Sequence, residues 1–167
     1  GIEPDTLLTL TEVIADELNK DGKHGNVHYV AMSGPTHAEE VAKDLPTTIV
    51  SACEDQAVAE KVQDVFMNKN MRVYTNSDRL GVELCGALKN VIALASGICS
   101  GLGYGDNMRA ALIIRGMAEI KRLGLKMGGK EDSFDGLAGM GDLIVTATSK
   151  ESRNNNAGYL IGKGKSA

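Results

Sequence analysis

A lysine and an asparagine lie in the middle of an otherwise apolar run. Lys89 and Asn90 interrupt the stretch 81–102, whose other residues are mostly small or apolar. Burying an ammonium group without a partner is costly, so this lysine needs either a carboxylate partner or surroundings that make it release its proton easily. Easy proton release is what acid–base catalysis by lysine uses. The alternative is a lysine that extends along the helix surface to solvent.

A second candidate is the segment Ser33-Gly34-Pro35-Thr36-His37, which lies between a short β-rich run and the expected start of a short helix. In open α/β sheets, ligands bind beyond the carboxyl ends of the strands, and backbone amides at a helix start attract anions. Gly34 would allow close approach to the backbone. The alternative is an ordinary turn in which Thr36 caps the helix. His37 is a candidate proton shuttle, although a single histidine near a cap is more often structural.

The third candidate combines Asp142, which lies among apolar residues, with the cluster Ser152-Arg153-Asn154. A carboxylate there could bind a substrate hydroxyl or pair with a buried lysine, and a Ser-Arg-Asn cluster at a helix start suits a phosphate. Taken singly, the aspartate could be a cap and the arginine a surface charge. Together the two features indicate one small anionic ligand.

These residues must be positioned by two kinds of structure, with a break near residues 76–78. Before the break, the apolar spacing predicts an amphipathic helix over 4–18, and β-rich runs predict strands over 27–32, 47–52 and 72–75. A helix with Val58, Val62, Val65 and Phe66 on one face is expected between the last two strands. Helices that join short strands imply parallel pairing and a sheet that is covered on both faces.

After the break the strand signal disappears. We expect a helix over 81–102 that is buried nearly all round, a second over 107–127 with Ile113, Met117 and Ile120 buried, and a third from about residue 152 towards 161. The glycine-rich stretch 101–105 follows a helix rather than a strand, so we interpret it as a helix-ending turn. The sequence therefore predicts the last part of an α/β domain followed by most of an all-helical one.

Composition excludes several classes of protein. The formal net charge of −4 provides no basic excess for binding a nucleic acid. No stretch is judged to reach the roughly 20 apolar residues of a membrane span, and the first residues do not resemble a signal peptide, so a cytoplasmic protein is expected. Cys53, Cys85 and Cys99 lack the spacing of a disulfide framework or a zinc site and are expected to be reduced core residues, and no metal is expected.

Five stretches carry a specific resemblance: SGPTHAEEVAKDLPTT, VYTNSDRLGVELCGALKNVIALASGICSGLGYGDN, RGMAEIKRLG, FDGLAGMGDLIVTATS, and SRN followed by LIGKG. In this order, over the whole chain, they resemble the bacterial NAD(P)-dependent sn-glycerol-3-phosphate dehydrogenases. The resemblance implies an α/β and then all-α fold. Residues 1–76 would be the C-terminal part of a Rossmann-like doubly wound domain, and 77–167 a 6-phosphogluconate-dehydrogenase-like helical domain that is incomplete at its C-terminus.

The resemblance also implies roles for individual residues. Lys89, in the ALKN motif, would be the catalytic proton donor and acceptor and would contact the substrate. The dinucleotide would lie beside Ala38 and Arg153. The remaining substrate-binding positions fall on Gly34, Thr36, Asp142, Ser152, Arg153 and Asn154.

The implied reaction is hydride transfer between NAD or NADP and a three-carbon phosphate, interconverting sn-glycerol 3-phosphate and dihydroxyacetone phosphate for phospholipid synthesis. A homodimer is expected. Asn155 and Asn156 stand where such proteins usually carry basic residues, and Cys85 and Ser100 where glycine and aspartate are expected. Because the family's opening G-x-G-x-x-[GA] loop does not precede Gly1, these residues alone are expected to bind dinucleotide weakly. The alternatives are a related hydroxyacid dehydrogenase and a non-catalytic fragment for phosphometabolite binding or dimerisation.

Overall fold

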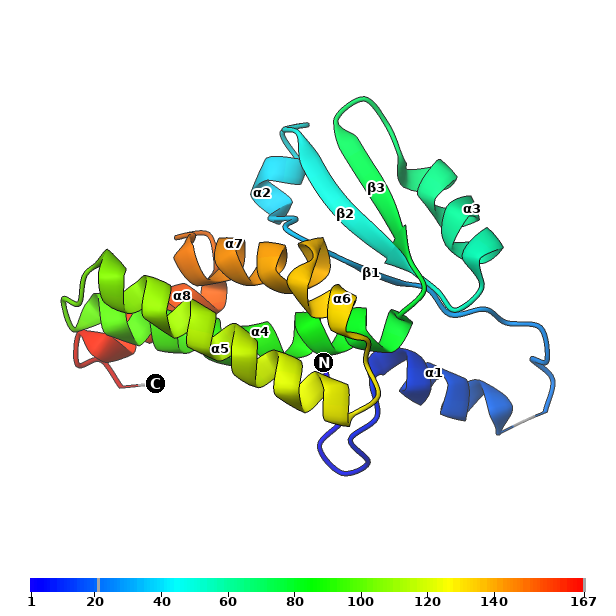
Figure 1. Ribbon diagram of the computed structural model, residues 1–167, viewed down its shortest axis with the longest axis horizontal. Coiled ribbons are helices and arrows are strands. Elements are labelled where there is room, and N and C mark those ends of the chain that lie inside the picture. Colours follow the sequence, from blue (N-terminus) through cyan, green and yellow to red (C-terminus); the bar gives the residue numbers. More distant parts are fainter. Residues whose placement is uncertain (21, 167) are drawn as a thin grey trace.

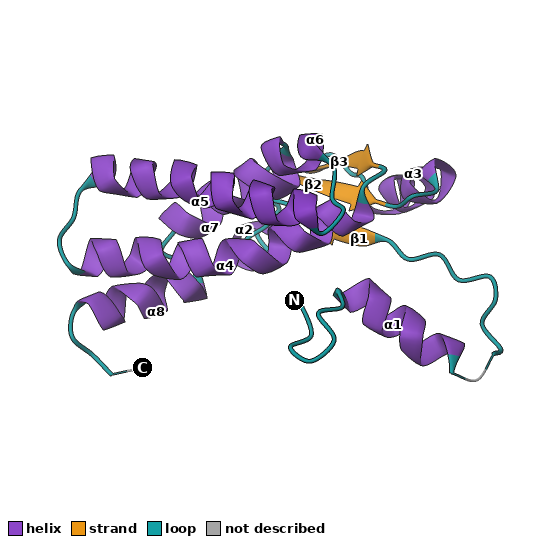
Figure 2. Ribbon diagram, turned by 60° about the horizontal axis from the view of Figure 1, so that its bottom comes forward, coloured by secondary structure: helices purple, strands orange, loops and turns teal. Residues whose placement is uncertain are grey.

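The chain forms a small three-stranded sheet followed by a group of long helices (Figure 1). The computed structural model describes residues 1–20 and 22–166, so Ala167, the last residue of the second predicted part, lies outside the described residues. The sheet lies on one side of the central helix α4 (Arg79–Gly101). Helices α5 (Asp106–Lys126) and α8 (Arg153–Gly162) run alongside α4 (Figure 2).

The sheet is mixed, with the strand order β1-β2-β3. Strands β2 (Thr47–Ala52) and β3 (Met71–Asn76) are parallel, as predicted, because α3 (Gln56–Phe66) carries the chain back between them. The prediction of parallel pairing is wrong for β1 (Ala31–Ser33), which is antiparallel to β2 and shorter than the strand expected over 27–32. The connection from β1 to β2 contains only the single-turn helix α2 (Ala38–Val41), which cannot return the chain along the sheet.

Both faces of the sheet are covered at the carboxyl end of β2. Val50 and Ala52 pack with Val82 of α4 on one face. On the other face, the Ser51 hydroxyl donates a hydrogen bond of 3.0 Å to the Ala59 carbonyl of α3. Because side chains alternate along a strand, this arrangement buries successive residues in opposite directions.

The prediction of which residues of α3 form its buried face is only partly right. Val65 and Phe66 are 73% and 48% exposed, and the buried residue of the helix is Ala59. The small side chain of Ala59 lets α3 approach β2 closely enough to accept the Ser51 hydroxyl. Backbone approach, rather than the row of large side chains, therefore sets which face meets the sheet.

Helix α1 (Leu10–Asn19) begins later than the predicted residue 4. Leu7 has a left-handed backbone (φ 61°), which ends any helical path from Pro4. Thr9 is the N-cap, and the Glu12 carboxylate accepts the Thr9 backbone N–H at 2.8 Å. This is a capping box, a start signal that outweighs the apolar spacing upstream of it.

The second part consists of helices that pack on α4, and its core includes Ile113, Met117 and Ile120, as predicted. The glycine-rich stretch ends α4 as a turn, as predicted, with Gly103 at φ 87°. The remaining elements of this second part are α5 (Asp106–Lys126), α6 (Glu131–Asp135), the π-helical turn η1 (Leu137–Gly141), α7 (Asp142–Thr148) and α8 (Arg153–Gly162).

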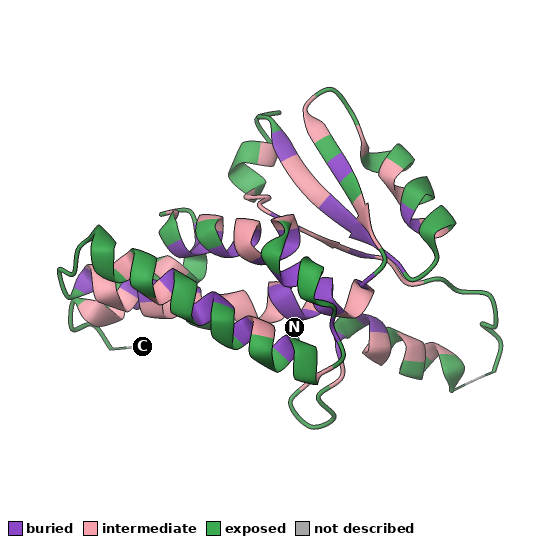
Figure 3. Cartoon of the chain, in the orientation of Figure 1, coloured by how far each residue is buried: buried purple, intermediate pink, exposed green. Residues whose placement is uncertain are grey.

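Helix α4 differs from the sequence-based expectations in its length of apolar sequence and in its burial. Among the described residues it is long and apolar enough to cross a membrane, by length and composition alone, whereas no such stretch was expected. It is the core helix of this fold, because it packs against α5, α7 and α8. It is also not buried all round: Val91 is 66% exposed, and many other residues of α4 are only partly buried, as the intermediate colour in Figure 3 shows.

The backbones of α4 and α8 touch, which the sequence analysis did not predict. A Cβ atom added at Gly97 would lie 1.9 Å from the Asn155 carbonyl oxygen, and one added at Gly158 would lie 2.0 Å from the Leu94 carbonyl oxygen. Such distances leave no room for any side chain. The start of α8 is therefore fixed directly against the middle of α4.

Candidate active site

Lys89 of α4 forms an ion pair with Asp142, the first residue of α7. The Asp142 side chain is 4% exposed and that of Lys89 is 20% exposed. The predicted carboxylate partner of the lysine is therefore present, and the lysine does not extend freely to solvent. Because Lys89 keeps partial access to a cavity, its ammonium group can still meet a ligand.

Asp142 is held by further donors on either side. The Thr146 hydroxyl, one turn later on α7, donates to Asp142 Oδ1 at 3.1 Å. The Ser33 hydroxyl at the end of β1 lies 3.5 Å from Asp142 Oδ2. These contacts fix which oxygen faces Lys89, so the lysine is held in one orientation.

The turn after β1 brings Gly34 and Thr36 to the same place. A Cβ atom at Gly34 would lie 3.1 Å from both the Ile49 Cα and the Thr48 carbonyl oxygen, so this residue lets the turn lie flat on β2. The Thr36 hydroxyl donates to the Gly34 carbonyl at 3.2 Å, and the N-cap of α2 is His37 rather than Thr36. Capping therefore does not explain why a threonine stands at position 36.

The predicted cluster at residues 152–154 lies at the start of α8. The Ser152 oxygen caps the helix by accepting the Asn155 N–H at 3.2 Å. The Asn154 amide donates to Asn90 Oδ1 at 3.0 Å, which ties the cluster to the residue after Lys89. Arg153 is exposed and forms no ion pair with any residue that the structure describes. Its charge is therefore available to an anion.

All the predicted site residues line one cavity of about 450 Å³, which we call the α8-side cavity. They come from the turn after β1, from α2, from the middle of α4 and from the starts of α7 and α8. The predicted residues in its wall are Gly34, Thr36, Ala38, Lys89, Asp142, Ser152, Arg153 and Asn154. The structure thus brings together residues up to 120 positions apart, although their individual roles stay predictions.

A second cavity, of about 480 Å³, shares four of these residues: Gly34, Thr36, Lys89 and Asp142. We call it the α1-side cavity, because Leu10 and Thr11 of α1 also line it. The ion pair therefore lies at the border of two cavities. The α8-side cavity has the Arg153 guanidinium in its wall, which lacks an ion-pair partner among residues 1–20 and 22–166, and the α1-side cavity is lined in part by α1.

The structure gives less support to a functional role for His37. His37 lines the α8-side cavity and its Nε2 atom is buried without a hydrogen-bond partner among the described residues, so the shuttle role stays a prediction.

Cys53 and Cys85 are buried, as expected, whereas Cys99 is only partly buried. Burial, with smaller contributions from the Asp78 and Asp142 charges, raises the pKa of the Cys85 thiol to about 12.

Sequence analysis missed several residues that support the site. Thr146 carries a signal that is too common to notice, because single hydroxyls occur throughout the chain, and Ser33 belongs to a candidate segment but was given no role of its own. Glu83 is different: it is a second charged residue in the same apolar run as Lys89 and could have been noticed by the same reasoning. In the described part of the chain, no cluster of three or more His, Cys, Asp or Glu side chains is arranged to hold a metal ion.

Comparisons with known proteins agree with one another. Residues 78–167 match the family model for the C-terminus of NAD-dependent glycerol-3-phosphate dehydrogenase, and residues 1–59 match the model for its N-terminus. The chain is 99% identical over 167 residues to glycerol-3-phosphate dehydrogenase (NAD(P)+) 2 of Lactobacillus delbrueckii subsp. bulgaricus and covers 50% of that protein. It is 60% identical to a Clostridium perfringens glycerol-3-phosphate dehydrogenase (NAD(P)+) and covers 49% of it.

The structural comparisons give the same family. A glycerol-3-phosphate dehydrogenase from Coxiella burnetii matches with a TM-score of 0.87 and 43% identity, over 94% of this chain and 46% of that one. The Plasmodium falciparum enzyme matches with a TM-score of 0.81 and 26% identity, over 96% of this chain and 43% of that one. These likenesses confirm the predicted α/β and then all-α fold class. The chain spans about half the length of the curated relatives it matches.

Proposed function

Because the chain belongs to the NAD-dependent glycerol-3-phosphate dehydrogenase family, we propose that it carries the acid–base and phosphate-binding half of that reaction. The reaction moves a hydride between a nicotinamide and C2 of the substrate, interconverting sn-glycerol 3-phosphate and dihydroxyacetone phosphate. The observation that carries this proposal is the Lys89–Asp142 pair, which shares one cavity with the Arg153 guanidinium, a cation that forms no ion pair within the described part of the chain.

The wall of the α8-side cavity fits part of a dinucleotide. Ala38 contributes a small side chain, and the Arg153 guanidinium lacks a carboxylate partner among the described residues. A small residue beside an unpaired cation leaves space for a flat ring and supplies a partner for a phosphate oxygen. Ala38 and Arg153 would therefore hold the cofactor. When bound, the nicotinamide supplies the hydride to C2 or takes it away.

Lys89 is the proton donor and acceptor in this proposal. In the direction of reduction, the Lys89 ammonium donates a proton to the C2 oxygen, and in the reverse direction the neutral amine takes that proton back. Asp142 holds the Nζ atom in place and balances its charge when protonated. Such general acid–base help contributes about 100-fold to 10,000-fold in rate.

The start of α8 holds the phosphate of the substrate. Arg153 would pair with it, and the Ser152 hydroxyl and the Asn154 amide would donate to its oxygens. These contacts lie away from the reacting carbon, so they bind and orient the substrate without changing its chemistry. Gly34 and Thr36 line the same cavity and would contact the three-carbon chain.

The substrate assignment is tested in the full-length Lactobacillus delbrueckii relative. Dihydroxyacetone phosphate should cause oxidation of NADH or NADPH, whereas dihydroxyacetone at the same concentration should cause almost none. Arg153→Gln should raise KM for the phosphorylated substrate about 10-fold to 100-fold, since a hydrogen bond to a charged group contributes about 1.5–3 kcal/mol. Equal turnover of the two substrates by the unmodified enzyme would contradict the proposal.

We further propose a cytoplasmic homodimer whose product enters phospholipid synthesis, with neither a nucleic acid nor a membrane as partner. The net charge of −4 supports the first exclusion, and exposed apolar side chains on α4 and α5, including Val91, Ile114 and Leu123, support self-association. Light scattering of the full-length relative should give twice the mass of one chain, and a monomer at micromolar concentration would contradict the dimer.

A further inference from the structure

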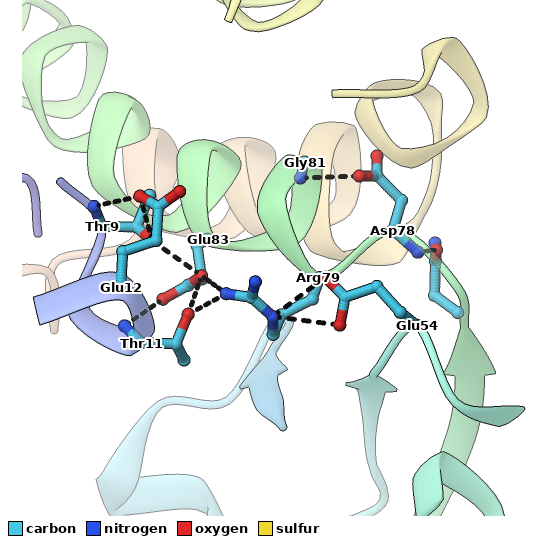
Figure 4. A network of polar contacts seen from close by, with 9 residues as sticks. Thr9, Thr11, Glu12, Glu54, Asp78, Arg79, Gly81 and Glu83 are labelled. Carbon is cyan, nitrogen blue, oxygen red and sulfur yellow. Dashed lines mark hydrogen bonds and ion pairs between the residues drawn. The ribbon is translucent and has the colours of Figure 1, made fainter. Parts of the chain in front are cut away.

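Glu83 is a buried carboxylate that the proposed reaction does not use. It lies on α4, six residues before Lys89, and its side chain is 9% exposed. Figure 4 shows it at the centre of a network that joins the start of α1 to the start of α4. A buried charge in such a position requires partners that compensate for its lost hydration.

Every contact of Glu83 comes from a donor. Thr11 contributes its backbone N–H at 2.9 Å to Oε1 and its hydroxyl at 2.6 Å to Oε2. The Thr9 hydroxyl lies 3.0 Å from Oε2, and the Arg79 guanidinium donates to the same oxygen at 2.8 Å. Arg79 also contacts the Thr11 hydroxyl and the exposed Glu54. These donors, which come from α1 and from the first turn of α4, hold the carboxylate in one place between the two helices.

This network forms a wall of the α1-side cavity. Glu83, Gly86 and Lys89 recur at intervals of three residues along α4, and all three line that cavity. Thr11 and Leu10 line it from α1. By fixing Thr11 onto α4, the Glu83 carboxylate sets where α1 stands relative to the Lys89 ammonium.

We propose that Glu83 is a positioning residue for the reaction, acting through Thr11 to set the width of the cavity beside Lys89. This inference rests on the proposed function, because it concerns the space in which the reacting carbon and the hydride donor must meet. Misplacing reacting groups by about 1 Å can cost about 100-fold in rate. A looser wall would also admit water next to the ion pair.

The network should affect turnover rather than phosphate binding. Neither Glu83 nor Thr11 lines the α8-side cavity, which contains Arg153 and the start of α8. Weakening the Glu83–Thr11 contacts should therefore lower kcat and leave KM for the phosphorylated substrate nearly unchanged. A residue that only stabilised the fold would not separate the two constants in this way.

The test uses the full-length Lactobacillus delbrueckii relative and a matched pair at position 11. Thr11→Val keeps the volume of the side chain and removes the hydroxyl, whereas Thr11→Ser keeps the hydroxyl. We expect Thr11→Val to lower kcat at least 10-fold with less than a 3-fold change in KM for dihydroxyacetone phosphate, and Thr11→Ser to keep kcat within about 3-fold of the unmodified enzyme. Glu83→Gln should lower kcat further.

Glu54→Gln is the control, because Glu54 contacts Arg79 from the exposed rim with a side chain that is 62% exposed. It should leave both constants unchanged. Equal kcat values for Thr11→Val and Thr11→Ser would overturn the positioning role, as would a Glu83→Gln enzyme that raises KM without lowering kcat. If the unmodified enzyme itself fails to oxidise the reduced nicotinamide with dihydroxyacetone phosphate, the proposed function fails instead.

Discussion

Replacing Asp142 by asparagine removes one charge from the ion pair with Lys89 and keeps the shape of the side chain. The Asp142 side chain is 4% exposed, so the Lys89 ammonium would lose its only carboxylate partner among the described residues. Breaking a buried pair in this way costs about 3–5 kcal/mol. Because the Lys89 side chain is 20% exposed, solvent can compensate in part, and we expect the lower end, about 3 kcal/mol.

The same change should affect catalysis in two ways. The asparagine has a single oxygen: if its nitrogen replaces Oδ2, that nitrogen faces the Lys89 ammonium and Ser33, and if it replaces Oδ1, Thr146 meets a donor in place of an acceptor. We expect kcat for dihydroxyacetone phosphate reduction to fall at least about 100-fold, the lower limit of general acid–base help. Arg153 and the α8 cluster are untouched, so KM should change less than kcat.

The assay is a double-mutant cycle in the full-length Lactobacillus delbrueckii relative. Urea unfolding and steady-state kinetics are measured for Asp142→Asn, Lys89→Met and the double variant. The two single changes should couple by more than about 1 kcal/mol in stability, since residues in direct contact are not additive. Additive effects, within about 0.5 kcal/mol, would show that the pair contributes no mutual stabilisation and would refute this reasoning.

Two further predictions concern the packing around the site. Because burial raises the pKa of the Cys85 thiol to about 12, above its value of about 8.5 in an unfolded chain, the stabilisation from the neutral thiol is complete below about pH 8.5 and is lost as the pH rises towards 12. Unmodified enzyme should therefore lose about 2 kcal/mol more than Cys85→Ala between pH 7 and pH 10 in urea unfolding, and parallel pH dependences would contradict this. Gly158→Ala should lower stability by about 1–3 kcal/mol, because its Cβ would lie 2.0 Å from the Leu94 carbonyl oxygen. At Gly25, in contrast, an added Cβ meets nothing within 4 Å, so Gly25→Ala should be nearly neutral in the same assay.

Much of the helical part could be predicted from the sequence because its signals are local. The break after β3, the start of α8 at Ser152 and the buried face of α5 follow from apolar spacing and turn residues, and all three agree with the structure. The Lys89–Asp142 pair was predicted only as one of several possibilities. A lysine in an apolar run indicates that a partner is needed, but the neighbouring residues in the sequence do not show that this partner is a carboxylate 53 residues away.

The remaining features depend on tertiary geometry. Strand β1 pairs antiparallel to β2 because the connection between them is short. The β-rich pattern of each strand does not show the direction in which the two strands pair. The late start of α1 was overlooked because the Thr9–Glu12 capping box lies inside an apolar repeat that extends upstream of it. The close approach of α4 and α8 requires glycines on both helices to face each other. The sequence of one helix does not show which glycines of the other helix it will meet.

The central claim is that the Lys89 ammonium transfers the proton to and from the C2 oxygen. The most direct measurement is kcat of the Lys89→Ala variant of the full-length Lactobacillus delbrueckii relative, with dihydroxyacetone phosphate and reduced nicotinamide, after equilibrium dialysis has established that it still binds the substrate. We expect a loss of about 100-fold to 10,000-fold in kcat. Ketone reduction at the rate of the unmodified enzyme would contradict it.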